Sequence, residues 1–156
     1  MKKILLSMLT WCILTTVQAQ MYNTGIGVRI GVDNGISLKH FVSDKNAVEG
    51  IVTFYKGINA TALYEWQREH DFDVKGLAWY YGVGGHVGFW NKNKSPFNEE
   101  GSGTKAVIGL DGVIGLEYLF ENAPITVGLD VRPIVNLIGD DGLWFQAGIN
   151  VRYVFN

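Results

Sequence analysis

The chain has 156 residues, with 13 Lys and Arg against 15 Asp and Glu, so its formal net charge is −2 at neutral pH. This mild acidity excludes the basic footprint of a nucleic-acid-binding protein, and the length suits one domain. The 20 glycines, 3 prolines and 13% aromatic residues favour a turn-rich β protein over a helical one.

Residues 1–19 have the pattern of a secretory signal peptide. Two lysines come first, an apolar run follows from Ile4 to Leu14, and Val17-Gln18-Ala19 offers a small-residue cleavage site. The run is shorter than the roughly 20 residues that a membrane-spanning helix needs. We therefore predict removal of this segment, which leaves residues 20–156 as the domain, with a charge of −4. Cys12, the only cysteine, lies in the signal, so no disulfide is expected.

The remaining sequence alternates between apolar and polar residues in segments that are separated by Gly, Asp and Asn clusters. The pattern predicts strands over residues 22–32, 35–43, 46–55, 58–68, 77–90, 105–120, 125–138 and 143–155. The last of these alternates almost without error and exceeds the roughly 9–11 residues that let a tilted strand cross a bilayer. An even number of strands joined by short hairpins predicts an all-β, antiparallel, up-and-down barrel.

Bulky apolar side chains occupy one face of these strands, and glycine alternates with charge on the other. An eight-stranded barrel has an interior only just wide enough for packed side chains, so the bulky face should point outward to lipid. We expect the charged face to fill the lumen with a salt-bridge network, because buried charges need partners. The predicted network contains Arg29, Lys39, Glu49, Glu65, His86, Asp111, Glu117, Asp130, Arg132 and Arg152.

A few positions conflict with this alternation. His40 falls on the lipid face, where it lies either at the membrane interface or at a β-bulge. Pro133 is at a position whose side chain should face lipid. Because proline has no N–H group, it should lose a hydrogen bond between strands unless a β-bulge accommodates it. Leu63 and Val113 fall on the lumen side.

With these features the chain resembles the small eight-stranded outer-membrane barrels of Gram-negative bacteria, of OmpA and OmpX-like architecture. The last strand resembles the insertion signal that the barrel-assembly machinery reads, although Asn156 follows its terminal aromatic residue. The residues of this assembly signal are Gln146, Gly148, Val151, Tyr153 and Phe155. The Ala19-Gln20 junction and the overall pattern resemble small outer-membrane proteins of Bacteroidota. The resemblance implies a location in the outer membrane, contact with lipid and lipopolysaccharide, and no particular activity.

Enzymes are known on barrels of this size, namely a lipid A deacylase with a His-x-Ser pair and a lipid A palmitoyltransferase. No histidine here is followed two residues later by serine. His86 and Asp111 could form a base and its orienting carboxylate on adjacent strands, yet no nucleophile accompanies them. We therefore expect no catalysis and no cofactor. The scattered histidines argue against a metal site, and Asp33, Glu99, Glu100, Asp140 and Asp141 suit either a solvated acidic rim or a weak Ca²⁺ or Mg²⁺ site.

The loop from Asn91 to Thr104 is the longest outer connection and the candidate recognition loop for a partner in the cell envelope. Its candidate contact residues are Lys92, Lys94, Phe97, Glu99 and Glu100. The leading hypothesis is a non-enzymatic outer-membrane barrel with a plugged lumen and a structural or interaction role. A narrow pore for small solutes and a secreted lipocalin-like ligand carrier are the alternatives, and a lipid-modifying enzyme is a fourth hypothesis.

Changing Tyr153 or Phe155 to Asp should impair barrel assembly. A charge on the lipid face costs free energy that depends on its depth, and the insertion signal would be lost. The measurement is the heat-dependent gel mobility of the membrane-extracted variant, and a normal shift would contradict the reading of the last strand.

Overall fold

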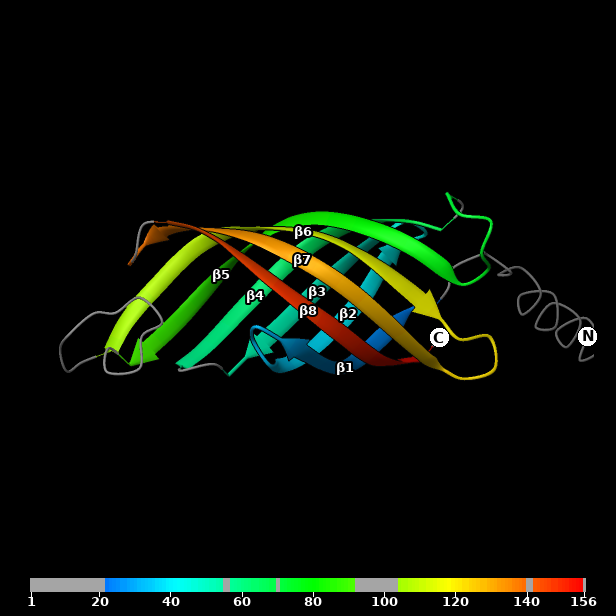
Figure 1. Ribbon diagram of the computed structural model, residues 1–156, viewed down its shortest axis with the longest axis horizontal. Coiled ribbons are helices and arrows are strands. Elements are labelled where there is room, and N and C mark those ends of the chain that lie inside the picture. The colour runs from blue at the N-terminus through cyan, green and yellow to red at the C-terminus, as the bar shows by residue number, and fades with distance from the viewer. Residues whose placement is uncertain (1–21, 55–56, 70, 92–103, 140–141, 156) are drawn as a thin grey trace, which may run out of the picture.

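The computed structural model describes residues 22–54, 57–69, 71–91, 104–139 and 142–155. Eight strands form one closed antiparallel barrel, in which β8 pairs with β1 (Figure 1). The strands are β1 (Thr24–Gly31), β2 (Gly35–Ser43), β3 (Asn46–Thr53), β4 (Gly57–Arg68), β5 (Leu77–Asn91), β6 (Thr104–Leu119), β7 (Ile125–Ile138) and β8 (Gly142–Phe155). The predicted fold class is confirmed, and each strand begins and ends within two residues of its predicted bounds. None of the described residues belongs to a helix that is long and apolar enough to span a membrane.

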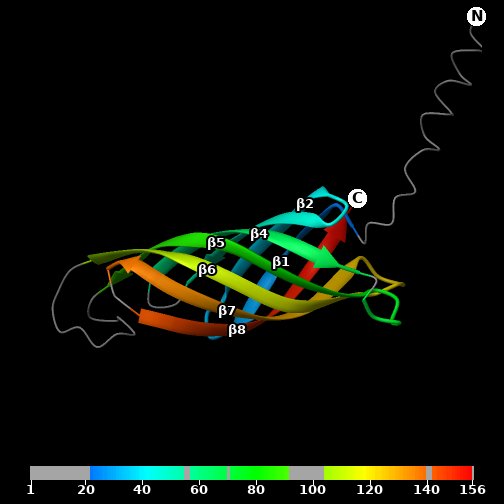
Figure 2. The same ribbon diagram turned by 90° about the horizontal axis from the view of Figure 1, so that it is seen from above.

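The strands run obliquely to the long axis, as expected for a closed barrel (Figures 1 and 2). The start of β1, the end of β8 and the β4–β5 and β6–β7 turns lie at one end of the barrel, here called the proximal end (Figure 1). The opposite end is called the distal end. β1, β2 and β3 have only 8 or 9 residues, whereas β5 to β8 have 14 to 16, so one side of the wall is longer than the other.

Polarity is inverted relative to a soluble protein. Large apolar side chains cover the outside, and representative exposed fractions are 57% for Ile30, 56% for Leu110 and 64% for Phe145. Charged side chains lie inside, including Arg132 and Arg152 at 0% exposure. This arrangement follows directly from the period-two pattern of the strands.

Glycines on the inner face make room for the largest interior side chains. A Cβ atom on Gly148 would lie 2.6 Å from Cζ of Arg29, and one on Gly115 would lie 2.5 Å from Cζ of Tyr80. Both distances are too short for non-bonded carbon atoms, so a side chain at either position would have to displace the guanidinium group of Arg29 or the ring of Tyr80. Glycines on the inner face therefore lie where long interior side chains of neighbouring strands need space.

His40 lies on the outer face near the proximal end of β2. Its Nδ1 atom is 2.8 Å from Oγ1 of Thr24, its register partner on β1, and the two are hydrogen-bonded. The irregularity in the β2–β3 pairing falls after it, between Phe41 and Ser43. His40 therefore lies before the irregularity and not within it, and its position at a membrane interface stays a prediction.

Pro133 is accommodated without a bulge. The β6–β7 register is the same on both sides of it, at Asp111↔Ile134 and Ile114↔Val131, and only the pairs between them are missing from the ladder. Gly112 lies opposite, where a Cβ atom would come within 3.1 Å of the proline ring. Proline has no N–H group and cannot donate a hydrogen bond to the neighbouring strand. The strand keeps its register despite this missing bond, because Gly112 leaves space for the proline ring. The β6–β7 register shift occurs elsewhere, between Ile108 and Gly109.

Gly148→Ala should destabilise the barrel by about 1–3 kcal/mol, since the added methyl group displaces the ion-paired Arg29. Gly50→Ala is the matched control, because nothing lies within 4 Å of a Cβ atom at this outward position. Urea unfolding of both variants in lipid vesicles, followed by tryptophan fluorescence, gives the comparison. Equal unfolding midpoints would contradict the packing role of Gly148.

Candidate functional site

The barrel interior brings together charged or titratable residues from every strand. The ten residues of the predicted network are all buried, with exposed fractions between 0% and 7%. The structure arranges them in two ionic clusters and one histidine pair. The strands contribute them at alternate positions, so closure of the barrel is what brings distant parts of the sequence together.

The proximal cluster centres on Arg152 of β8. Its Nη1 donates to Oε2 of Glu117 on β6 at 2.7 Å, and its Nη2 donates to Oε1 of Glu49 on β3. Its Nε donates to Oγ of Ser37 on β2 at 2.8 Å, and Ser37 in turn donates to Glu49 at 2.5 Å. One guanidinium therefore connects four strands across the lumen.

Lys39 completes this cluster from β2. Its Nζ atom donates to Oε1 of Gln67 at 2.8 Å and lies 3.0 Å from Oε2 of Glu65 and 3.7 Å from Oε1 of Glu117. The same atom lies 4.2 Å from the ring centroid of Tyr80, in cation–π geometry. The ammonium group is thus enclosed by carboxylates, an amide and an aromatic ring, which is how a fully buried lysine retains partners for its charge.

The distal cluster is built on Arg29 of β1 and Arg132 of β7. Nη1 of Arg29 lies 2.7 and 2.5 Å from the two carboxylate oxygens of Asp130, and its Nε lies 3.3 Å from Oδ1 of Asp33. Nη2 of Arg132 donates to Oδ2 of Asp33 at 2.6 Å and also to Oε1 of Gln146 at 2.6 Å. Asp33 therefore bridges two arginines.

The placement of Asp33 corrects the sequence interpretation. The sequence predicts Asp33 at an acidic rim, either solvated or with a weakly bound divalent cation, but it is 2% exposed and paired with two guanidinium groups. Asp33, the second residue after the end of β1, turns inward and pairs with Arg29 and Arg132. Asp140, Asp141, Glu99 and Glu100 lie outside the described residues, and no group of three or more His, Cys, Asp or Glu within the described part could hold a metal ion.

Tyr80 of β5 connects the two ionic clusters. Its ring contacts Lys39 of the proximal cluster, and its hydroxyl donates to Oδ2 of Asp130 in the distal cluster at 3.4 Å. Its ring also packs with three buried apolar side chains. These are Ile51, Leu63 and Val113. The two residues that conflicted with the predicted polar lumen, Leu63 and Val113, thus form an apolar patch inside the barrel.

His86 and Asp111 form a separate pair on β5 and β6. Nδ1 of His86 lies 2.5 Å from Oδ1 of Asp111, and Nε2 lies 3.1 Å from Oδ1 of Asn136. An amide, and not a nucleophilic hydroxyl, therefore occupies the position that a triad nucleophile would take. A Cβ atom on the facing Gly109 would lie 2.5 Å from Cε1 of the imidazole, so the ring is also tightly packed. The geometry suits a structural hydrogen bond.

An apolar cluster of Tyr22, Phe41, Ala47 and Val154 lies at the proximal end. The rings of Tyr22 and Phe41 meet edge to face at 5.1 Å, and the Tyr22 hydroxyl donates to Oε1 of Glu117 at 2.8 Å. Burial raises the pKa of the Tyr22 phenol well above its ordinary value, so the hydroxyl stays protonated and can donate. The segment before β1 thus caps the ionic network.

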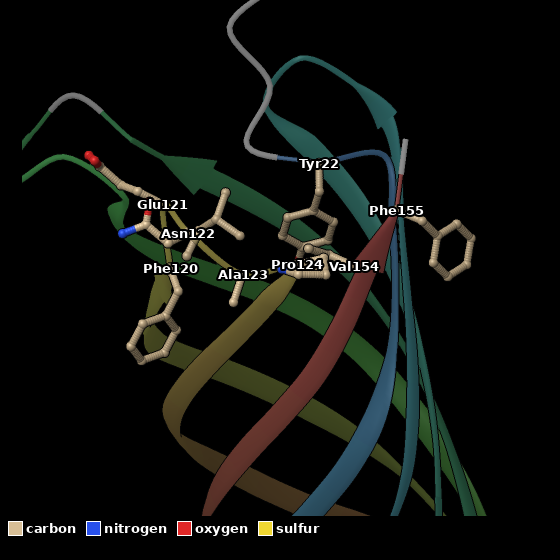
Figure 3. Close-up of a pocket in the computed structure, with 9 residues that line it drawn as sticks. Tyr22, Phe120, Glu121, Asn122, Ala123, Pro124, Val154 and Phe155 are labelled. Carbon is tan, nitrogen blue, oxygen red and sulfur yellow. The ribbon is translucent and has the colours of Figure 1, made fainter.

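A pocket of about 340 Å³ lies beside this cap, between the β6–β7 turn and the end of β8 (Figure 3). Tyr22, Pro124 and Val154 lie together on one side, whereas the ring of Phe155 points away from the pocket (Figure 3). A backbone hydrogen bond of 2.9 Å from Val154 N to Pro124 O ties the β6–β7 turn to β8.

The residues of the assembly signal divide between the two faces of β8. Gln146 accepts a hydrogen bond from Arg132, and Gly148 packs against Arg29. Val151, Tyr153 and Phe155 lie on the outer face, with exposed fractions of 38%, 56% and 47%. The remaining predictions concern residues 1–19 and the loop residues Lys92, Lys94, Phe97, Glu99 and Glu100, all of which lie outside the described residues.

Several partners in the interior were missed at the level of sequence. The additional residues are Tyr22, Asp33, Ser37, Gln67, Tyr80, Asn136 and Asn150. Ser37, Gln67 and Tyr80 are each an even number of residues from an inward-facing charged or titratable residue on the same strand. The alternation of the strand could therefore have identified them as inward-facing. Asp33 lies beyond the end of β1, where strand alternation no longer predicts which way a side chain points.

No protein-family model matches the chain, and no match was found among the curated proteins. A solved structure does resemble it, the N-terminal β-barrel domain of Pseudomonas aeruginosa OprF. The TM-score is 0.66 at 16% sequence identity, and the alignment covers 88% of this chain and 100% of the OprF domain. The chain therefore has the fold of an eight-stranded outer-membrane barrel domain. The likeness to Bacteroidota proteins stays a prediction.

Arg152→Met should lower the free energy of unfolding by about 3–5 kcal/mol, because it leaves Glu49 and Glu117 buried beside an uncharged side chain. Lys75→Met is the control, since Lys75 forms an exposed ion pair with Glu121 at 3.1 Å and should contribute less than about 1 kcal/mol. Urea titration in lipid vesicles measures both. An equally small loss for the two variants would show that the interior ion pairs do not stabilise the barrel.

Proposed function

We propose that this protein is an integral outer-membrane β-barrel with a closed lumen and a structural or interaction role in the cell envelope. The observation that carries the proposal is the inversion of polarity, with charged residues inside and large apolar residues outside. Such a surface is far more apolar than soluble monomers tolerate, and lipid is the solvent that suits it. The OprF-like fold supports the same location.

The ion pairs of the interior favour a closed lumen over a pore. Arg152 reaches from β8 to β3 and β6, Lys39 from β2 to β4 and β6, and Arg29 from β1 to β7. Conduction would require several of these buried pairs to separate together, each at a cost of several kcal/mol. A charged interior also makes a poor site for a lipophile, which argues against a secreted carrier.

The partners belong to the same proposal. Lipid and lipopolysaccharide would contact the apolar outer wall, and the barrel-assembly machinery would read the last strand during insertion. The loop between β5 and β6 is the candidate contact for an envelope protein, because the other distal connections are short and barrels of this type place recognition on long loops.

Leu110→Arg tests the membrane location directly. Leu110 lies outward near the middle of β6, where a charge facing lipid should cost about 2–4 kcal/mol. Phe120→Arg, just beyond the proximal end of β6, should cost about 0–1 kcal/mol. Vesicle unfolding titrations give both values. In a soluble barrel both exposed substitutions would be nearly neutral, within roughly 0.5 kcal/mol.

A cellular experiment accompanies this test. The protein should fractionate with the outer membrane, resist carbonate and urea extraction, and change gel mobility on boiling. Planar-bilayer recordings of the purified barrel should stay silent across voltage. Release without detergent would overturn the membrane location, whereas steady conductance would overturn only the closed lumen.

A further inference from the structure

Residues 71–76 of the β4–β5 turn include two exposed apolar side chains among charged ones. Phe72 is 41% exposed and Val74 is 51% exposed. The turn is fixed in place, because Asp71 accepts a hydrogen bond of 2.6 Å from Nε1 of Trp79 on β5. A second bond, from Leu119 N to Gly76 O at 2.8 Å, ties it to the end of β6. Phe72 is therefore held against the outer wall of the barrel.

A groove of about 370 Å³ lies between this turn and the wall. Phe72 and Trp79 border it on one side, and outward-facing side chains of β6 and β7 form its floor. These floor residues are Ile114, Leu116, Leu129 and Val131. The groove belongs to the proximal part of the wall, since Trp79, Leu116 and Leu129 pair with one another two to four residues from the proximal ends of β5, β6 and β7.

Aromatic side chains mark this height of the wall as a membrane interface. Tyr64, Trp66, Tyr81 and Trp79 form a continuous series with ring centroids 5.1, 5.5 and 5.4 Å apart. Aromatic girdles of this kind lie at the headgroup level of barrel proteins. The groove thus lies where a lipid would place the upper part of an acyl chain, next to its headgroup.

The charges around the groove complement a zwitterionic headgroup. Arg68 is exposed on the outer face of β4 and is the register partner of Trp79, which borders the groove. Asp71 and Asp73 flank Phe72 in the turn. A guanidinium matches a phosphate, and carboxylates match an ammonium group. Acids outnumber bases among Arg68 and the described residues of the proximal turns, with Asp44, Glu69, Asp71, Asp73 and Glu121 against Lys45, Arg68 and Lys75.

We propose that this groove binds a phosphatidylethanolamine molecule from the proximal leaflet. An acyl chain occupies the apolar groove beneath Phe72, the phosphate meets Arg68, and the ammonium meets the carboxylates of Asp71 and Asp73. The acidic surroundings disfavour an anionic lipid such as phosphatidylglycerol, whose headgroup lacks an ammonium. The inference rests on the proposed membrane location of the barrel.

The test uses the full barrel in nanodiscs of phosphatidylethanolamine and phosphatidylglycerol at equal amounts, followed by native mass spectrometry of the released protein. The wild-type barrel should retain phosphatidylethanolamine at least about fivefold over phosphatidylglycerol. Phe72→Ala should lower this retention roughly tenfold, because it opens the groove, and Arg68→Gln should lower it about fivefold. Phe145→Ala, an exposed aromatic at the distal end, is the matched control and should leave retention unchanged.

The outcomes separate the inference from the proposed function. A barrel that enters nanodiscs and shows heat-modifiable mobility, yet retains both lipids equally, overturns the lipid site and leaves the membrane location intact. Equal losses in Phe72→Ala and Phe145→Ala, or a second copy of the chain in place of lipid, also overturn the site. Failure to enter nanodiscs overturns the proposed function itself. Because Phe72 lies in a turn, its variant should keep the gel shift of the wild type.

Discussion

The interior ion pairs are the interaction on which the barrel depends. Eight strands enclose too little space for water to solvate a row of charges, so each charged side chain must find its partner on another strand. Arg152 does this through Glu49 and Glu117, and Arg29 does it through Asp130. Because the outer face makes mainly apolar contacts, these ion pairs also determine how the side chains of the inner face pack against one another.

The fold was readable from the sequence because period-two alternation and glycine-rich turns are local signals. The inward parity of Lys39, Glu65 and Arg132 likewise follows from counting along each strand. The pairing was not readable, because it depends on which strands face each other across the lumen. Arg152, for example, meets Glu49 103 positions earlier in the chain.

At Asp33 and Pro133 the local sequence pattern does not determine the structure. Asp33 follows the end of β1, so strand alternation does not predict its direction. Only the closed barrel shows that Arg29 and Arg132 both contact it. Pro133 suggested a bulge because proline interrupts a ladder, but Gly112 on the facing strand made that distortion unnecessary. The fold of the β4–β5 turn over the outer wall was equally hidden, since it depends on the contact between Asp71 and Trp79.

The unequal strand lengths bear on how such a barrel would lie in a bilayer. β1 and β3 have 8 residues each, fewer than the roughly 9–11 that a tilted strand needs to span the hydrocarbon, whereas β6 has 16. Hydrophobic mismatch on one side of the wall is relieved by tilting the barrel axis or by thinning the lipid next to the short strands. In a bilayer, the lipid next to the short strands β1, β2 and β3 would therefore deform more than the lipid next to the longer strands.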